Sequence, residues 1–333
     1  MAGMKQLGNN LYTGKTSFPF VGRRRLWFII AAALVIGAAL VPLFRPIQLS
    51  IEFTGGSQFT VSGLSSPDQT LATDAVASVI PDAVARVTTV GDSAVRVQTE
   101  QLDEGQNDAQ AQQIVDALAD AYGVPTSEVT ASFIGPTWGA DVTRQSLWGL
   151  AIFLALTFVI LALYFRTWKM SVAAIIGLVD VLIITVGVYA LAGFEISPAA
   201  VIGFLTILSY SLYDTTVVFD KVRENTRDDG EISGRTYGES VNLAANQTLI
   251  RSINTTVVAV LPVGSILFIG ALLLNARTLS DISLSIFVGT IVAAYSTLFV
   301  AVPLYALLRE REPAITERDS RVLAAREKAG VPA

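Results

Sequence analysis

The sequence contains no cysteine and no histidine, and only 15% of its 333 residues are charged. Without cysteine there is no disulfide framework, no Cys/His zinc site and no cysteine nucleophile, and without histidine there is no Ser-His-Asp triad. Low charge combined with 52% hydrophobic residues is the reverse of a disordered composition. The net charge of −5 argues against nucleic acid as a partner. We expect no metal and no cofactor.

Long apolar runs are what the chain has instead. Six stretches are long enough to cross a bilayer, which takes about 20 residues. They cover 26–44, 147–165, 172–192, 198–219, 253–274 and 282–308. The only charged residues inside them are Asp180 and Asp214. The last stretch is long and contains Pro303, so we expect it to be tilted, kinked or partly interfacial. The sequence predicts a polytopic α-helical membrane protein with six transmembrane helices.

Lys and Arg are distributed unevenly between the two sides of the predicted bundle. All but five of the 23 lie in residues 1–25, in the turn 166–169, in the loop 220–252 or in the tail 309–333. The five on the other side are Arg45, Arg86, Arg96, Arg144 and Arg277. Because cytoplasmic loops are enriched in Lys and Arg, both termini are predicted to be cytoplasmic. Residues 45–145 are then extracytoplasmic, between the first and second spans.

That extracytoplasmic segment has the pattern of an α+β domain. Strand-like runs and helical periodicities alternate along it in the order β-α-β-β-α-β. They lie at 58–61, 68–80, 84–90, 94–99, 106–122 and 127–134, with a Gly91-Asp92 turn between the two central strands. This order is typical of the ferredoxin-like layout. The domain has no catalytic cluster, so it is either a binding face for a partner or client chain or a spacer that braces the helices.

Asp214, late in the fourth span, is the most informative residue. A carboxylate at the bilayer centre costs about 2.5–3.5 kcal/mol and normally faces a bundle interior or a wet cavity. Hydroxyl residues flank it and can carry a chain of water molecules. They are Ser209, Tyr210, Ser211, Thr215 and Thr216. We therefore interpret Asp214 as a proton or ion site; the alternative is a structural hydrogen bond between helices.

Three further polar positions are candidates for the same pathway. Asp180, in the third span, has aliphatic neighbours in sequence. A functional role and a structural hydrogen bond between buried helices are therefore equally good interpretations of this residue. Arg251 precedes the fifth span; it either extends to the lipid headgroups or reaches the cavity and pairs with Asp214. Asn254 and Thr255 follow it and can line the same cavity.

At this point the residues resemble the SecF members of the SecD/SecF family, within the resistance-nodulation-division (RND) superfamily. The resemblance runs from about residue 11 to 308 and joins several motifs in order. They are LYTGKTSFPFVGRRRLWF, IEFTGGSQF, SFIGPTWGADV, VDVLIITVGVYALAGFEIS, SYSLYDTTVVFDKVREN and NQTLIRSINTT. The fold expected from it is half of an RND-type bundle with one extracytoplasmic domain.

The resemblance implies a non-enzymatic role in the bacterial cytoplasmic membrane. Such a subunit pairs with SecD and uses the proton-motive force to help export a preprotein after SecA and the SecYEG channel have begun. Asp214 matches the family's proton-pathway carboxylate, Arg251 and Thr255 match the polar positions implicated with it, and Asp180 matches a usual third-span acid. The extracytoplasmic motif contributes Glu52, Gly55 and Gly56. Carboxylates and hydroxyls suit sodium as well as protons.

The chain also departs from the family pattern. Glu52 stands where Asp is common, and Val179 stands where His often precedes the third-span acid. Ser209 and Tyr213 stand near Asp214, where Gly and Asn are usual. Tyr213 is bulkier than Asn and can alter the hydration of the neighbouring carboxylate. No role is predicted for the tail 309–333.

Two other functions stay open at this stage. The first is an RND-type exporter of small molecules or lipids, or half of one; a complete exporter predicts two repeats of six spans and larger outer domains, whereas this chain has one repeat. The second is a passive scaffold that stabilises SecD, with structural acids. In the favoured mechanism, protonation of Asp214 releases Arg251, the bundle repacks, and the outer domain tilts.

Overall fold

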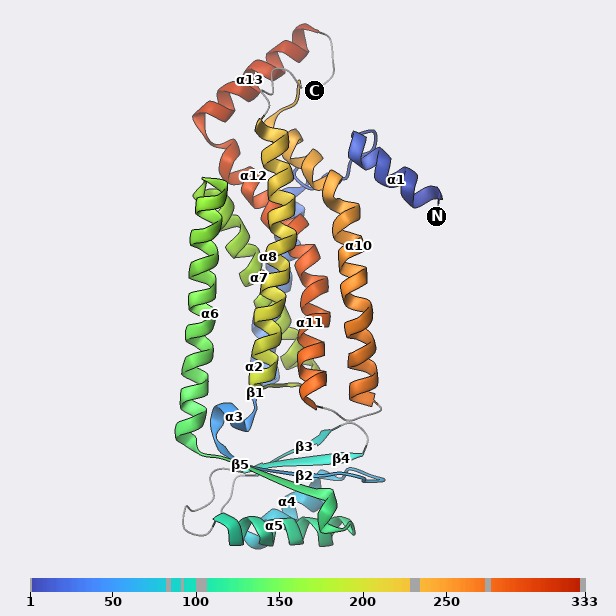
Figure 1. The fold of residues 1–333 in the computed structure, drawn as a ribbon, viewed down its shortest axis with the longest axis vertical. Coiled ribbons are helices and arrows are strands. Elements are labelled where there is room, and N and C mark those ends of the chain that lie inside the picture. The colour runs from blue at the N-terminus through green and yellow to red at the C-terminus, as the bar shows by residue number, and fades with distance from the viewer. Residues whose placement is uncertain are drawn as a thin grey trace.

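The computed structural model describes residues 2–81, 85–90, 93–99, 107–227, 234–272 and 277–329. The molecule is elongated: a bundle of long helices carries an α+β domain at one end, and helices α1 and α13 lie at the opposite end (Figure 1). The ranges of these terminal helices are Ala2–Thr13 and Pro313–Lys328.

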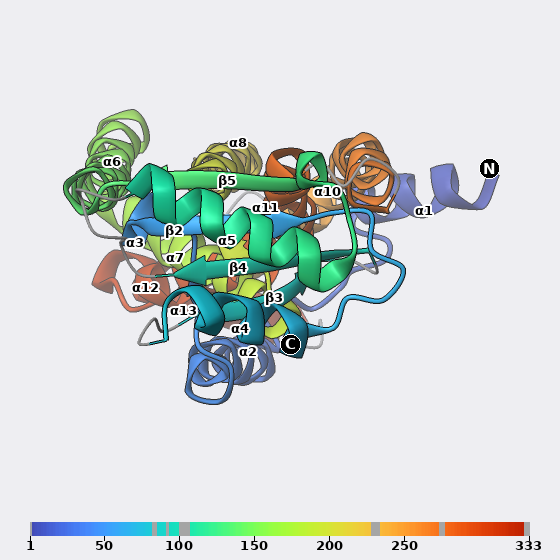
Figure 2. The same ribbon diagram turned by 90° about the horizontal axis from the view of Figure 1, so that it is seen from below.

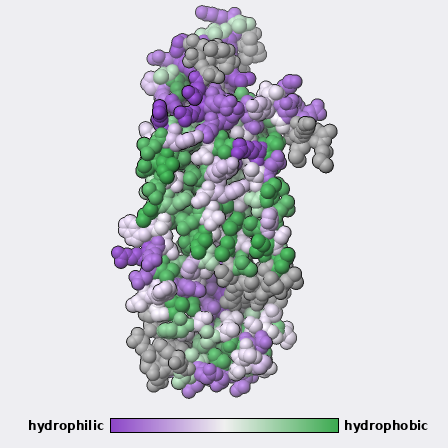
Figure 3. All heavy atoms as spheres, viewed as in Figure 1, coloured by the Kyte–Doolittle hydropathy of each residue, from purple (hydrophilic) through white to green (hydrophobic). Residues whose placement is uncertain are grey.

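Six helical segments among the described residues are long and apolar enough to span a membrane. They are α2 (Arg24–Phe44), α6 (Pro136–Phe165), α7 (Trp168–Ala192), α8 (Pro198–Arg227), α10 (Tyr237–Leu272) and a sixth segment formed by α11 (Arg277–Ser296), a π-helical turn (Thr297–Ala301) and α12 (Val302–Glu310). On the face seen in Figure 3, apolar residues form a belt around the bundle, and hydrophilic residues gather at the end that carries α13. The chain is a multi-pass helical membrane protein.

The segment 220–252, predicted as a loop, is mostly helix. Helix α8 continues to Arg227 and α10 starts at Tyr237. The extensions persist because they bury apolar residues such as Val222 and Val241. The first residues of the predicted tail complete α12, and α13 then packs back on α10, where Asp319 accepts a 2.9 Å hydrogen bond from the Tyr237 amide.

The helices differ in how much of their surface the bundle buries. In the most apolar 18-residue stretch of each helix, 56% of the residues are buried in α7 and in the sixth segment, compared with 6% in α2 and 11% in α6. The helices α7, α8 and α11 therefore form the centre of the bundle, while α2, α6 and α10 present apolar side chains outward. Small residues allow the closest contacts; a Cβ on Gly187 of α7 would lie 2.5 Å from the Cβ of Ala38 of α2.

The α+β domain contains a four-stranded antiparallel sheet with two helices on one face (Figure 2). Its elements are β2 (Gly56–Val61), α4 (Gln69–Val79), β3 (Arg86–Val90), β4 (Ala94–Thr99), α5 (Asn107–Tyr122), a 3-10 turn (Thr126–Glu128) and β5 (Val129–Ile134). The strand order is β3-β4-β2-β5. The predicted Gly91-Asp92 turn lies outside the described residues.

Alternation along the strands separates an apolar face from a polar one. Phe59 and Val97 are opposite each other in the register and belong to the core with α4 and α5. Because successive residues point to opposite faces, Gln58 and Thr60 of β2, with their partners Gln98 and Arg96 of β4, lie on the other face. That polar face is directed toward the helix bundle (Figure 1).

A small junction joins the domain to the bundle. Strand β1 (Gln48–Leu49), directly after α2, pairs in parallel with β6 (Glu195–Ile196), which lies between α7 and α8. The short helix α3 (Ile51–Thr54) follows β1.

Candidate ion pathway in the helix bundle

Asp214 lies inside the bundle, on the inward face of α8. The residue is only 8% exposed. The hydroxyl of Ser252, on α10, donates a hydrogen bond of 2.7 Å to its Oδ2. Ser211 and Thr215, one turn before and one residue after, are also buried. A carboxylate with a hydroxyl partner and polar neighbours has the surroundings expected for reversible protonation.

Arg251 is directly before Ser252 but points to the outer side of the pair. Its Nη2 donates a 3.1 Å hydrogen bond to the hydroxyl of Tyr213, the residue before Asp214. Both Arg251 and Tyr213 are exposed in the isolated chain. The structure thus has no direct Arg251–Asp214 ion pair; the tyrosine hydroxyl binds the guanidinium instead. The contact also differs from simple extension toward headgroups.

Asn254 and Thr255 are close in sequence to this pair, but neither the Asn254 amide nor the Thr255 hydroxyl binds the Asp214 carboxylate. The Thr255 hydroxyl donates to the carbonyl oxygens of Arg251 and Ser252, at 3.0 Å each. Asn254 is exposed on the outer face of α10. Sequence reasoning therefore missed Ser252, the direct partner. Its signal was present, since Ser252 stands inside the NQTLIRSINTT motif.

Asp180 is a second buried carboxylate, in the middle of α7, and it is 5% exposed. Its Oδ2 is buried without a hydrogen-bond partner. Ser296, at the end of α11, lies beside it, and the Ser296 hydroxyl donates 3.0 Å to the carbonyl oxygen of Gly177. Its surroundings are thus less apolar than its sequence neighbours indicated.

The π-helical turn Thr297–Ala301 connects the surroundings of the two carboxylates. On one side, the buried hydroxyls of Thr297 and Thr215 are hydrogen-bonded at 2.9 Å. On the other side, a Cβ on Gly177 would contact the Cβ of Ala301 at 3.3 Å. Pro303 follows within α12, directly after this turn. Single π-helical turns within α-helices are frequent at functional sites.

Glu52, Gly55 and Gly56 do not join this site; they lie in the junction at the domain end. Glu52 is half-buried on α3. Gly55 and Gly56 have φ values of 73° and 116°, which only glycine adopts readily. The start of α6 packs against this turn, where a Cβ on Gly139 would lie 2.8 Å from the Phe53 carbonyl oxygen. The motif therefore shapes the domain's attachment.

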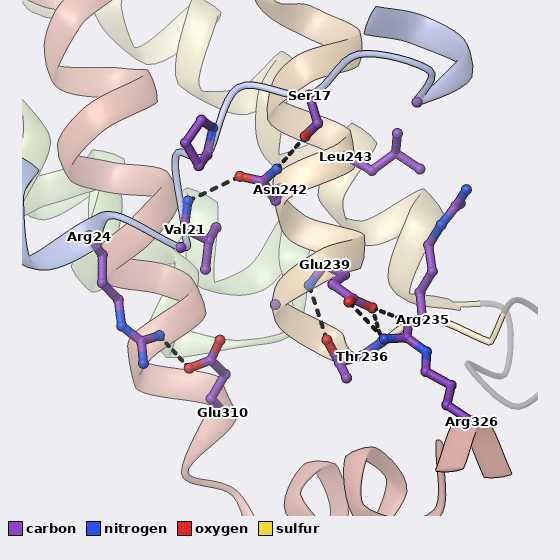
Figure 4. Close-up of a pocket in the computed structure, with 14 residues that line it drawn as sticks. Ser17, Val21, Arg24, Arg235, Thr236, Glu239, Asn242, Leu243, Glu310 and Arg326 are labelled. Atoms are coloured by element: carbon purple, nitrogen blue, oxygen red, sulfur yellow. Dashed lines mark hydrogen bonds and ion pairs between the residues drawn. The ribbon is translucent and has the colours of Figure 1, made fainter. Parts of the chain in front are cut away.

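A separate cavity of about 670 Å³ lies at the other end of the bundle. Figure 4 shows Arg24 pointing to Glu310 and Arg326 pointing to Glu239 across it, and both are ion pairs. Asn242 accepts a 3.1 Å hydrogen bond from the Val21 amide. The first ion pair joins α2 to α12 and the second joins α13 to α10, while the Asn242 bond fixes the segment before α2 to the start of α10.

Within the described ranges, no three acidic side chains come together as a metal site. The site instead combines two buried carboxylates, hydroxyls and a guanidinium bound to a tyrosine.

Six membrane-spanning segments, an attached α+β domain and two carboxylates buried between the helices define a multi-pass helical membrane protein with ionisable groups inside its bundle. The family model for the C-terminal part of the protein export membrane proteins SecD/SecF matches residues 114–311, and that for the SecD/SecF GG motif matches residues 41–62. The chain belongs to the SecD/SecF family.

Individual relatives agree with this assignment. The chain is 42% identical to the protein translocase subunit SecF of Streptomyces coelicolor, over 98% of this chain and 86% of that relative. It is 37% identical to the SecF subunit of Mycobacterium tuberculosis, over 98% and 74%. The crystal structure of SecDF from Thermus thermophilus, described as a translocon-associated membrane protein, superposes with a TM-score of 0.74 at 28% identity. That match covers 89% of this chain and 39% of the longer SecDF chain.

Proposed function

We propose that this chain is a SecF-type, non-enzymatic accessory subunit of the Sec preprotein translocase that works with SecD to drive export by ion flow. One observation carries the ion-coupling part: Asp214 is buried in the bundle with a serine hydroxyl as its partner. A permanent ion pair would hold the carboxylate charged, whereas a hydroxyl partner can serve both the charged and the neutral form.

The membrane orientation is part of the proposal. Both termini lie in the cytoplasm, and residues 45–145 form a ferredoxin-like extracytoplasmic domain of a bacterial cytoplasmic membrane protein. The position of Lys and Arg supports this orientation. The β-α-β-β-α-β element order and the antiparallel strand order β3-β4-β2-β5 support the ferredoxin-like assignment.

SecD is the proposed direct partner, and it docks on the outer face of α8 and α10. This face carries Tyr213, Arg251 and Asn254, all exposed in the isolated chain. Polar groups facing lipid are costly, so a protein partner that covers them resolves the cost. The translocating preprotein and the SecYEG channel with SecA complete the proposed assembly.

The proposed cycle uses the contacts around Asp214. Entry of a proton from the outer side neutralises Asp214, which weakens the charge-assisted bond from Ser252 and the attraction of nearby Arg251. Helices α8 and α10 then repack, and the ion leaves on the cytoplasmic side. One charge moved across 100 mV is worth about 2.3 kcal/mol, enough to bias a two-state bundle. Residues Asp180 and Thr255 complete the proposed pathway.

The test is translocation of a precursor into inverted membrane vesicles that contain SecD and either the wild-type chain or Asp214→Asn, each with and without a protonophore. We expect only the wild type to give a protonophore-sensitive increment. A matched control is Asp220→Asn, on the same helix but exposed at its end, which should keep the increment. Equal increments for Asp214→Asn and wild type would leave a passive scaffold for SecD as the function.

A further inference from the structure

The turn between α7 and α8 places one acidic side chain against the polar face of the sheet. This turn contains Glu195, between the end of α7 at Ala192 and the start of α8 at Pro198. Glu195 forms an ion pair with Arg96 on β4, and the two side chains are each only 10% exposed. The turn is short, so Glu195 moves with the ends of both helices.

The ion pair is part of a larger contact. Gln98 lies two residues along β4 from Arg96. Its Nε2 donates a 3.1 Å hydrogen bond to Glu195 Oε1 and a 3.2 Å hydrogen bond to Gln58 Oε1 on β2. Glu195 therefore contacts β4 directly through two side chains, and Gln98 links this contact to the neighbouring strand β2. Its backbone belongs to β6, which pairs with β1, and the Ser50 amide donates 3.1 Å to the Ile196 carbonyl oxygen. The turn is thus bonded to the domain on two sides.

The two helices joined by this turn are those that carry the buried carboxylates. Asp180 lies on α7 and Asp214 lies on α8. A shift of either helix on protonation must move Glu195, and a buried charge pair does not slide freely, because separating it leaves an uncompensated charge.

We propose that Glu195 and Arg96 are the coupling pair that makes the α+β domain follow the α7–α8 hairpin when the carboxylates change their protonation state. The proposal deepens the proposed function, because it names the contact through which the ion site would move the outer domain. Glu195 and Arg96 are positioning residues that act at a distance from Asp214. The pair acts as a rigid connection, as its burial and the adjoining β1–β6 pairing indicate.

A distance measurement tests the coupling without depending on export. Because the chain has no cysteine, two introduced cysteines are the only sites for spin labels. One label replaces Leu71 on the domain and the other Leu261 on α10; they are 40% and 65% exposed. The full-length labelled chain is measured in lipid bilayers in four forms. The first has no further substitution, the second carries Glu195→Gln, the third carries Asp214→Asn, and the fourth carries both.

We expect Asp214→Asn, which mimics the neutral acid, to shift the distance distribution when Glu195 is present. Glu195→Gln should broaden the distribution and abolish that shift. The exchanged pair Glu195→Arg with Arg96→Glu should restore it, whereas either exchange alone should not. A shift that persists in the Glu195→Gln background, or a distribution that Glu195→Gln leaves narrow, would overturn the proposal.

Export assays then separate this proposal from the proposed function. Glu195→Gln should lower the protonophore-sensitive increment several-fold at equal protein level. The control is Glu239→Gln, which breaks the ion pair with Arg326 at the far end of the bundle and should not lower it. If the wild-type chain gives no increment, the proposed function fails while the distance result still decides the coupling. If the wild type gives an increment that Glu195→Gln does not change, the coupling fails alone.

Discussion

The hydroxyl of Ser252 donates a 2.7 Å hydrogen bond to Asp214 Oδ2, and this bond joins α10 to α8 inside the bundle. The adjacent residue, Arg251, binds the hydroxyl of Tyr213 on the outer side of the same helix pair. The carboxylate is thus contacted by a neutral donor from within, while the cation stays one tyrosine away. This arrangement leaves Asp214 free to change charge without breaking an ion pair.

Ser252→Ala should impair ion coupling because it removes this donor. A hydrogen bond to a charged group is worth about 1.5–3 kcal/mol, so we expect a loss of roughly tenfold or more in the protonophore-sensitive export rate. Ser252→Thr retains the hydroxyl and should retain most of the rate. An alanine variant as active as the wild type would show that the donor is dispensable.

Tyr213→Phe should loosen Arg251 and reduce coupling less than Asp214→Asn does. The hydroxyl holds the guanidinium at 3.1 Å, and its loss leaves the carboxylate and Ser252 unchanged. The matched control is Tyr210→Phe on the same helix, because the Tyr210 hydroxyl is buried without a hydrogen-bond partner. The same export assay compares them, and equal effects of both substitutions would contradict a specific role for Tyr213.

Gly187→Ala should destabilise the packing of α7 on α2. An added Cβ would lie 2.5 Å from the Ala38 Cβ and 2.7 Å from its Cα, and overpacking of this kind typically costs about 1–3 kcal/mol. We expect a lower unfolding temperature in detergent micelles. Gly149→Ala, where no atom lies within 4 Å of the new Cβ, should be neutral. A Gly187→Ala variant with wild-type unfolding temperature would mean that α2 moves aside at no cost.

Asp68 should make the stability of the α+β domain depend on acid pH. It caps α4 by accepting a 2.9 Å hydrogen bond from the Thr70 amide, and its bonds to Thr70 lower the pKa of the carboxyl below its ordinary 3.8. A lowered pKa stabilises the fold above pH 3.8, and the contribution fades as pH falls from there through the folded-state value. Asp68→Asn should therefore unfold at a lower temperature than the wild type at neutral pH.

The difference in unfolding temperature between the wild type and Asp68→Asn should shrink as the pH falls below 3.8, and it should not shrink at alkaline pH. Thermal unfolding of the full-length chain at a series of pH values measures it. A difference that stays constant down to the lowest pH would contradict the charge contribution of the cap.

Much of the architecture follows from the sequence for physical reasons that act locally. Runs of apolar residues that are long enough for a bilayer predict the six spans, since no other environment suits them. Period-two and helical patterns predict the order of strands and helices in the α+β domain, because each element has one apolar face. The segment 220–252 was misjudged as a loop, since polar helical extensions lack the apolar run that marks a span.

The sequence by itself determined which residues are unusual in their setting: Asp180 and Asp214 are the charges inside apolar spans, and Arg251 stands at the edge of one. Only the tertiary structure decided their partners. Neighbours on a helix point about 100° apart, so whether Arg251 or Ser252 faces Asp214 depends on the rotation of α10 against α8. The Glu195–Arg96 pair joins a turn between spans to a strand about 100 residues earlier in the chain, and no local pattern encodes such a contact.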